Sequence, residues 1–252
     1  MPPEKRTRVI LSTDAKNEAD DQFAIVHALL TPSFELHGIL PAHFGTARSP
    51  TSLQDSHDEV MLLLRLMDLE GQVRIADGAA AAIPDASTPA PSPGAELIVA
   101  EALKDDPRPL HIAFLGPLTD MASALLLAPE IARRAVRVIW IGGGHWPVGN
   151  REYNLSNDIA AANVVARSGV ELWQIPMPVY RRMAVSYAEL HERVAGQGPL
   201  GRYLARQLID WNERMVPYPI EHRSLGDSPA IGVMMYPECG ESDWVPAPST
   251  AR

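Results

Sequence analysis

Short runs of β-branched and aliphatic residues alternate with longer segments of helical periodicity, and this alternation constrains the fold more than any other feature of the sequence. The runs that predict strands are residues 8–13, 35–40, 73–76, 110–115, 136–141 and 171–175. The segments that predict helices are 20–30, 52–68, 94–104, 120–134, 159–168 and most of 187–215. Such alternation is typical of βαβ units, so we expect an α/β fold with a mainly parallel sheet flanked by helices.

The size of the chain favours one domain. The 252 residues, 46% of them hydrophobic, are enough for one substantial core, and we find no internal repeat or linker. We therefore expect a single Rossmann-like domain over residues 1–252. In such sheets ligands bind beyond the carboxyl ends of the strands, where the strand order reverses, so functional residues should directly follow strands.

Charge and composition exclude several classes of partner. The formal net charge of −9 disfavours binding to nucleic acid, because an acidic surface repels phosphates. The single cysteine, Cys239, cannot form an internal disulfide or a Cys/His zinc site. No apolar stretch predicts a secretory signal or a membrane span, so we expect a cytoplasmic protein that does not bind membranes.

The segment after the first predicted strand, TDAKNEADD, places Asp14, Glu18, Asp20 and Asp21 in one short loop. Carboxylates this close repel one another unless a cation or bound protons compensate. Oxygen ligands on a flexible loop suit Ca²⁺ or Mg²⁺. The alternative is that Asp20 and Asp21 only cap the following helix, which leaves Asp14 unexplained.

This loop resembles the N-terminal motif of the inosine–uridine-preferring nucleoside hydrolases, in a divergent branch that carries an Asn-Glu insert. Three further segments are similar to that family in the same order: 115–144 with Gly-Pro-Leu-Thr, 149–158 with Glu-Tyr-Asn, and 225–231 with Asp-Ser-Pro. The resemblance covers nearly the whole chain. It implies a nucleoside hydrolase-like fold and hydrolysis of the N-glycosidic bond of a nucleoside or a nucleoside-like compound.

The resemblance also implies a calcium site. Asp14, Asp21, Asp227 and the main-chain carbonyl of Thr119 match the positions that hold Ca²⁺ in the family. Asp14 in addition matches the general base that takes a proton from the metal-bound water. Taken alone, Asp227 before Ser-Pro would be read as an ordinary helix N-cap, and Thr119 as a capping threonine.

Substrate-binding positions follow from the same resemblance. Asp20, Glu152 and Asn154 match residues that hold the sugar hydroxyls, and Asp227 is assigned to the substrate as well as to the metal. His43 lies where the family usually has a sugar-binding asparagine, so it is a candidate substitute. Taken alone, Glu152 and Asn154 would pass for part of a solvated loop. A small-molecule glycoside is the expected partner, bound by a homodimer or homotetramer.

The sequence departs from the family pattern at three further places. Two extra residues separate Asp14 from the Asp pair, so Lys16, Asn17 or Glu18 could enter the site. Gly226 stands where many members have a histidine that protonates the leaving group. The helical segment around 187–215 is shorter than usual. The replacement acids that stay open are His43, His145, His222, Tyr153 and Tyr180.

Three other functions remain open at this stage. The nearest alternative keeps the chemistry and changes the substrate to another small glycoside. The second is a non-catalytic, calcium-dependent sugar-binding protein, which would have no need for the candidate base Asp14. The third is a regulatory protein that binds a partner through an old enzyme scaffold.

Overall fold

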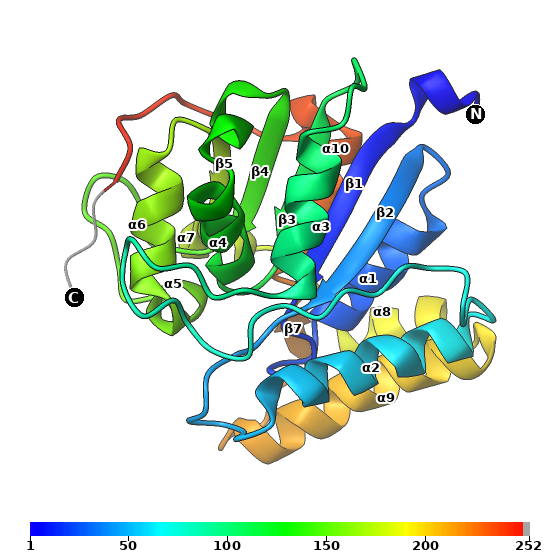
Figure 1. Cartoon of the computed structure of the whole chain (residues 1–252). Coiled ribbons are helices and arrows are strands. Elements are labelled where there is room, and N and C mark those ends of the chain that lie inside the picture. The colour runs from blue at the N-terminus through cyan, green and yellow to red at the C-terminus, as the bar shows by residue number, and fades with distance from the viewer. Residues whose placement is uncertain (249–252) are drawn as a thin grey trace.

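The computed structural model describes residues 1–248 and contains a five-stranded parallel sheet in the spatial order β2-β1-β3-β4-β5 (Figure 1). The strands are β1 (Thr7–Thr13), β2 (Phe34–Pro41), β3 (Leu110–Phe114), β4 (Val136–Ile141) and β5 (Glu171–Ile175). The longer helices are α1 (Asp21–Leu30), α2 (Ser52–Leu66), α3 (Pro93–Ala102), α4 (Thr119–Leu127), α6 (Ile159–Arg167), α9 (Gly198–Met215) and α10 (Ser228–Met235). The predicted α/β fold with helices flanking a parallel sheet is confirmed.

Side chains that alternate along the strands supply two separate cores, one on each face of the sheet. Ile10 of β1 belongs to the core that includes residues of α3, α4 and α6, whereas its neighbours Val9 and Leu11 belong to the core that includes residues of α1, α2 and α10. All three side chains are fully buried. This is the period of two that a strand covered on both faces requires, and it explains why strands of this sheet are continuous apolar runs.

The strand order reverses between β1 and β3. The chain leaves β1 to form β2 on one side and later returns to form β3 on the other side, and both pairs are parallel. Because the connections diverge there, a crevice opens beyond the carboxyl ends of these two strands. The first residues after them are Asp14 and Leu115. The topology therefore places the predicted acidic loop at the switch point.

Several local predictions were wrong. Residues 73–76 form no strand, and only Ile75 makes a bridge to β2. The predicted helix 120–134 ends at Leu127, because Pro129 cannot donate the next helical hydrogen bond, and a 3₁₀-helix (Pro129–Arg133) follows. A short antiparallel pair, β6 (Ala184–Ser186) and β7 (His222–Ser224), was not predicted.

The short helices complete the fold. Two of them, α5 (Tyr153–Asn157) and α7 (Met177–Tyr180), follow β4 and β5 and were also missed by the sequence patterns. The predicted helical segment 187–215 consists of α8 (Tyr187–Glu189), a π-helix (Leu190–Ala195) and α9. Helices α2 and α9 lie side by side below the sheet in Figure 1. Within residues 1–248, no helix is long and apolar enough to cross a membrane.

Candidate active site

A small cavity lies at the switch point, beyond the carboxyl ends of β1, β3 and β4. Its volume is about 60 Å³. The residues that line it are Asp14, Asn17, Glu18, Asp20, Asp21, Leu115, Ile141, Glu152, Tyr153, Asn154, Tyr180, Gly226 and Asp227. The structure thus brings together six of the site residues predicted from the sequence: Asp14, Asp20, Asp21, Glu152, Asn154 and Asp227.

Four of the lining carboxylates come from three different parts of the chain. Asp14 directly follows β1, Asp20 and Asp21 stand at the start of α1, and Asp227 stands at the start of α10. One oxygen each of Asp20, Asp21 and Asp227 lies within 4.8 Å of the other two. Asp14 fits beside them because residue 116 is glycine: a Cβ there would lie 2.7 Å from the Asp14 carboxyl carbon.

Helix capping does not explain these carboxylates. Asp20 and Asp227 occupy the N-cap positions of α1 and α10, yet neither side chain accepts a capping hydrogen bond from its own helix. Asp20 instead accepts a hydrogen bond from the main-chain N–H of Gly226, at 2.8 Å. Asp21 accepts one from the Thr13 hydroxyl, at 2.5 Å. The two helix starts are therefore tied across the cavity.

Burial and mutual repulsion strongly perturb the acids. Burial, and then the charges of Glu18 and Asp21, raises the pKa of Asp20 to about 7. Burial also raises the pKa of Asp21 to about 6, against the lowering effect of the Thr13 hydrogen bond. The pKa values of Asp14 and Asp227 lie well above the usual range for aspartate, because both are buried and both face Asp21. A cation bound among these groups would relieve the repulsion.

The donor set fits a hard divalent cation. Several carboxylate oxygens converge, and no histidine of residues 1–248 lines the cavity. Oxygen ligands of this kind suit Ca²⁺ or Mg²⁺ better than zinc or copper. The structure therefore contains a buried Asp cluster able to hold a metal ion.

Leu115 and not Thr119 lines the cavity, and the Leu115 carbonyl accepts a hydrogen bond from the lining residue Asn154, which argues against the sequence assignment of Thr119. Thr119 does not line the cavity; its carbonyl accepts a hydrogen bond from the Ser123 hydroxyl inside α4. Its hydroxyl is bound to His43 and Asp158. Leu115 does line the cavity, because it ends the chain run that leaves β3 at the switch point.

His43 also lies away from the cavity, contrary to its predicted role in sugar binding. The ring is buried, and Nδ1 accepts a hydrogen bond from the main-chain N–H of Gly45. The proton is therefore on Nε2, which donates to the Thr119 hydroxyl at 2.9 Å, and that hydroxyl donates to Asp158 at 2.8 Å. Burial lowers the pKa of His43. In this structure His43 begins a hydrogen-bonded chain that runs through the Thr119 hydroxyl to Asp158.

Glu152 and Asn154 hold the ends of the strands together at the cavity. Asn154 donates from Nδ2 to the carbonyls of Leu115 and Ile141, which end the runs of β3 and β4, at 2.6 and 2.9 Å. The Glu152 side chain caps α5 and also accepts the N–H of Gly143 at 2.8 Å. Both side chains are buried, so the reading of this segment as a solvated loop is wrong.

The extra residues of the β1–α1 loop face either the cavity or helix α2. Asn17 and Glu18 line the cavity, and Asn17 donates to Asp14 at 3.2 Å. Lys16 turns away, and its ammonium group donates to Glu59 of α2 at 2.8 Å. Glu18 is held by an ion pair with Arg223. The insertion thus contributes a polar wall to the cavity.

Comparison with known proteins decides the family. The family model for inosine-uridine preferring nucleoside hydrolases matches residues 9–246. The chain belongs to this family. It is therefore an N-glycosyl hydrolase that cleaves the N-glycosidic bond of nucleosides, as the sequence resemblance predicts.

Individual relatives of this nucleoside hydrolase have low sequence identity to it, but the matches extend over most of the chain. The chain is 24% identical to the probable uridine nucleosidase 2 of Arabidopsis thaliana, covering 90% of this chain and 76% of that protein. It is 27% identical to uridine nucleosidase 1 of the same plant, covering 75% of this chain and 61% of that protein. The purine-preferring ribonucleoside hydrolase of Gardnerella vaginalis has the same fold, with a TM-score of 0.75 at 22% identity, covering 92% and 80% of the two chains.

An aromatic ring fills the space beside Gly226, where the resemblance places the leaving-group histidine of many family members. A Cβ at Gly226 would lie 3.0 Å from the Tyr180 ring and 3.1 Å from an Asp20 oxygen, so the ring already occupies the space of a side chain there. The Tyr180 hydroxyl donates to Glu152 at 3.0 Å. Burial, and then the Glu152 charge and hydrogen bond, raises the pKa of Tyr180, which makes it a weaker proton donor.

The structure reduces the number of candidate leaving-group acids. Of the five that the sequence left open, only Tyr153 and Tyr180 line the cavity. The Tyr153 hydroxyl donates to the Phe44 carbonyl at 3.0 Å, and the Arg48 guanidinium lies 4.2 Å above the Tyr153 ring. Sequence reasoning missed Leu115, although its position at the carboxyl end of the predicted strand 110–115 was the signal that could have found it.

Proposed function

We propose that this nucleoside hydrolase uses Ca²⁺, held by Asp14, Asp21, Asp227 and the carbonyl of Leu115. One observation carries the proposal: aspartates from three segments line one cavity and are buried there, and the two that occupy N-cap positions make no capping hydrogen bonds. Buried carboxylates without compensating cations are costly, and a bound divalent ion would remove that cost.

The side chains of the site would divide the chemistry as follows. When bound, the cation supplies positive charge that lowers the pKa of a water molecule and fixes its position. Asp14 accepts the proton of the water that attacks the anomeric carbon, since it combines a buried carboxylate with a place in the same cavity. Asp20 and Glu152 favour the positive charge that develops on the sugar as the glycosidic bond loosens. Asn154 orients the sugar beside them.

We propose a ribonucleoside as the substrate. The names of the relatives include uridine nucleosidases, a pyrimidine-specific and a purine-preferring ribonucleoside hydrolase, so the shared element is the ribosyl group and not one base. Asp20, Glu152, Asn154 and Asp227 line the cavity, and their side-chain oxygens can accept hydrogen bonds from sugar hydroxyls. Base recognition would then involve residues outside this small cavity.

The alternatives make different demands on the same residues. A hydrolase of another small glycoside would keep Asp14 and the cation and change only the substrate. A calcium-dependent binding protein would bind ribose in the presence of the cation and release no sugar from a nucleoside, because binding needs no general base.

The decisive experiment combines calorimetric titration of Ca²⁺ with a reducing-sugar assay on inosine, uridine and nitrophenyl riboside. We expect cation binding that a chelator reverses, and sugar release that depends on the cation. Absence of divalent-cation binding would remove the proposed mechanism. Binding of Ca²⁺ and ribose without release of sugar from any of the three compounds would favour the binding protein.

We further propose that the enzyme works in the cytoplasm as a homodimer or homotetramer. Large apolar side chains are exposed near the cavity on the loop after β4 and on α7, among them Val148 and Val179, and a second copy could cover them. Light scattering on the eluting protein measures the oligomeric state, and cell fractionation measures the location.

A further inference from the structure

We propose that Glu59 is a positioning residue that holds both ends of the Asp14–Asp21 loop from its outer side and so sets the spacing of the cation ligands. Glu59 belongs to α2, lies outside the cavity and is only 3% exposed. The inference rests on the proposed cation site, but it concerns a residue that the sequence patterns did not single out.

Glu59 receives hydrogen bonds from three separate elements. One carboxylate oxygen accepts from Lys16 Nζ at 2.8 Å, and Lys16 lies two residues after Asp14. The other oxygen accepts from Gln22 Nε2 at 2.9 Å, and Gln22 directly follows Asp21. That same oxygen accepts from the hydroxyl of Tyr203 on α9. A single buried carboxylate therefore joins the first and last turns of the acidic loop to two helices.

The backbone of the loop shows why such an anchor is needed. The N–H of Asn17 bonds to the carbonyl of Asp14 at 3.0 Å, which closes a turn with Lys16 as its third residue. Lys16 has a φ of +87°, a value at which this position normally holds glycine. A lysine is unfavourable there for the backbone, so its side chain must contribute through its contact with Glu59.

Repulsion inside the loop acts in the opposite direction. The carboxylates of Asp14 and Asp21 are both buried in the cavity and have no lysine or arginine in an ion pair among residues 1–248. Without a cation these groups push the two ends of the loop apart. The bonds from Lys16 and Gln22 counter this movement, because they fix both ends of the loop on the two oxygens of one carboxylate of α2.

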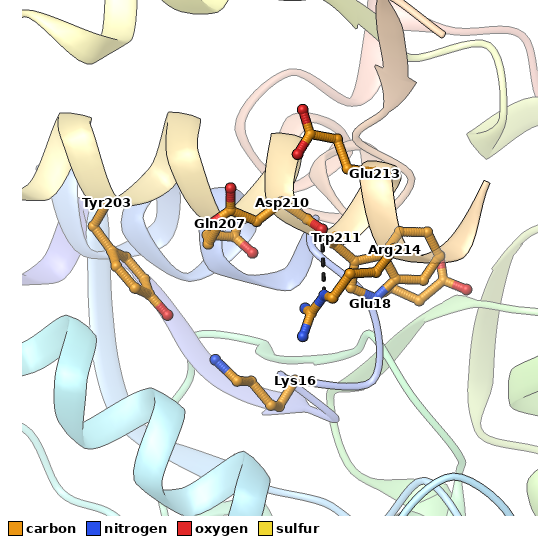
Figure 2. A pocket seen from close by; sticks show the side chains of 8 residues that line it. All are labelled: Lys16, Glu18, Tyr203, Gln207, Asp210, Trp211, Glu213 and Arg214. Carbon is orange, nitrogen blue, oxygen red and sulfur yellow. Dashed lines mark hydrogen bonds between the residues drawn. The ribbon is translucent and has the colours of Figure 1, made fainter. Parts of the chain in front are cut away.

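Figure 2 shows the outer side of the loop, where Lys16 extends along a hollow beneath α9 toward Tyr203. The hollow has a volume of about 480 Å³, and its walls include Gln207 and Trp211 of α9. Gln207 adds another tie to the loop by donating to the carbonyl of Ala19 at 2.9 Å. The loop thus rests on α2 and α9 on its outer side and presents its carboxylates on its inner side.

The chain contains a matched control at the other end of the sheet. Glu101 of α3 is 5% exposed and accepts from Lys104, which is 53% exposed, at 2.6 Å. The Lys16–Glu59 pair has almost the same burial, with Lys16 51% exposed. Glu101 also binds Arg8, near the start of β1, far along the strand from Asp14. Loss of either pair removes one buried glutamate charge, but only one pair touches the acidic loop.

The test compares Glu59→Gln and Lys16→Met with Glu101→Gln and Lys104→Met. Two quantities are measured: hydrogen exchange of peptides covering residues 13–22 in the chelator-treated protein, and the dissociation constant for Ca²⁺. We expect faster exchange in that loop and roughly tenfold or greater weakening of Ca²⁺ affinity only in the first pair, since residues that support metal ligands typically have effects of this size. Lys16→Gly, which suits the φ of +87°, should weaken Ca²⁺ affinity in the same way.

Three outcomes separate this inference from the cation proposal. Unchanged loop exchange in Glu59→Gln overturns the positioning role, whatever the protein binds. Faster exchange with an unchanged Ca²⁺ dissociation constant also overturns it, because the anchor would then not set the ligand spacing. If the parent protein binds no divalent cation, the proposed metal site fails, while the exchange comparison with Glu101→Gln still decides whether Glu59 holds the loop.

Discussion

Two sets of residues line the cavity, and they differ in how far the protein itself compensates their buried charge. The first, the carboxylate set, consists of Asp14, Asp20, Asp21 and Asp227. Its members lie close to one another with little compensation from the protein, and their pKa values are raised by burial and by each other. Such a set is arranged for a ligand that the protein itself does not supply.

The second, the Tyr180 set, consists of Glu152, Tyr180 and Gly226. Here the charge is satisfied internally: the Glu152 carboxylate accepts hydrogen bonds from three main-chain N–H groups and from the Tyr180 hydroxyl. The Tyr180 ring fills the space beside Gly226. The carboxylate set can therefore hold a metal ion, whereas the space beside Gly226 is already filled by the Tyr180 ring.

The largest expected effect tests this division directly. Asp14→Asn and Asp21→Asn should lose Ca²⁺ affinity and activity together, with kcat/KM for Asp14→Asn falling about a thousandfold, since general bases typically contribute a hundredfold to ten thousandfold. Glu152→Gln should keep its Ca²⁺ affinity and lose turnover. Calorimetry and steady-state kinetics on the same preparations provide both values.

The same variants allow a check on stability. Without a cation, Asp21→Asn should melt at a higher temperature than the parent, because one repelling charge is gone. An equal Ca²⁺ dissociation constant in Asp21→Asn and in the parent would show that Asp21 does not bind the ion. A weakened affinity in Glu152→Gln would show that the two sets are not separate.

The second prediction concerns the leaving group. Protonation of a poor leaving group typically contributes on the order of a hundredfold or more, and Gly226 cannot provide it. We expect slow cleavage of inosine and faster cleavage of nitrophenyl riboside, whose aglycone needs no proton. The measurement is the ratio of kcat/KM for the two substrates at one calcium concentration.

Tyr180→Phe provides the control for that ratio. If Tyr180 only fills space and binds Glu152, the variant should change both substrates by the same factor. A selective loss on inosine would identify Tyr180 as the acid, in spite of its raised pKa. Comparable efficiency of the parent enzyme on both substrates would show that an effective acid exists elsewhere.

Most of the fold could be predicted from the sequence, because the strands of a parallel sheet are continuous apolar runs between amphipathic helices. The ranges predicted for β4 and β5 match the structure to the residue. Residues 73–76 have the same composition as a strand, but they pair with β2 at one residue only. The pair β6–β7 joins segments that are distant in the chain, and no local pattern reveals such a contact. The expectation that residues 1–252 form a single domain stays a prediction.

For the candidate site, the sequence predicted some residues correctly near the cavity and misplaced others. The carboxylate cluster of Asp14, Asp20 and Asp21 could be recognised directly after the first predicted strand, where ligands bind in such sheets, and the resemblance to the family added Asp227. The direction of a side chain does not follow in this way. Thr119 and His43 each come shortly after a strand of the parallel sheet. Their side chains nevertheless belong to a separate hydrogen-bonded chain that ends at Asp158. The position of the Tyr180 ring at Gly226 likewise depends on packing between distant segments.

The smallest expected effect concerns the pH dependence of stability, and it again separates the two sets. Asp20 and Asp21 have pKa values of about 7 and about 6 in the folded state, raised from 3.8 mainly by burial. The folded state therefore binds more protons than the unfolded state between about pH 4 and pH 7, so stability decreases as pH rises through this window. The chelator-treated protein should melt several degrees lower at pH 8 than at pH 5.5, a shift that corresponds to about 1 kcal/mol or more in a domain of this size. Saturating Ca²⁺ should abolish the decrease, because the ion replaces the protons as the compensating charge. The Ca²⁺ affinity should rise with pH for the same reason.

Two variants provide the controls for this pH dependence. Asp20→Asn should flatten the dependence of the melting temperature on pH in the chelator-treated protein, whereas Tyr180→Phe should leave its slope unchanged. A melting temperature that rises steadily from pH 5.5 to pH 8 without a cation would mean that the carboxylate set is already compensated within the protein, and the contrast between the two sets would then be lost.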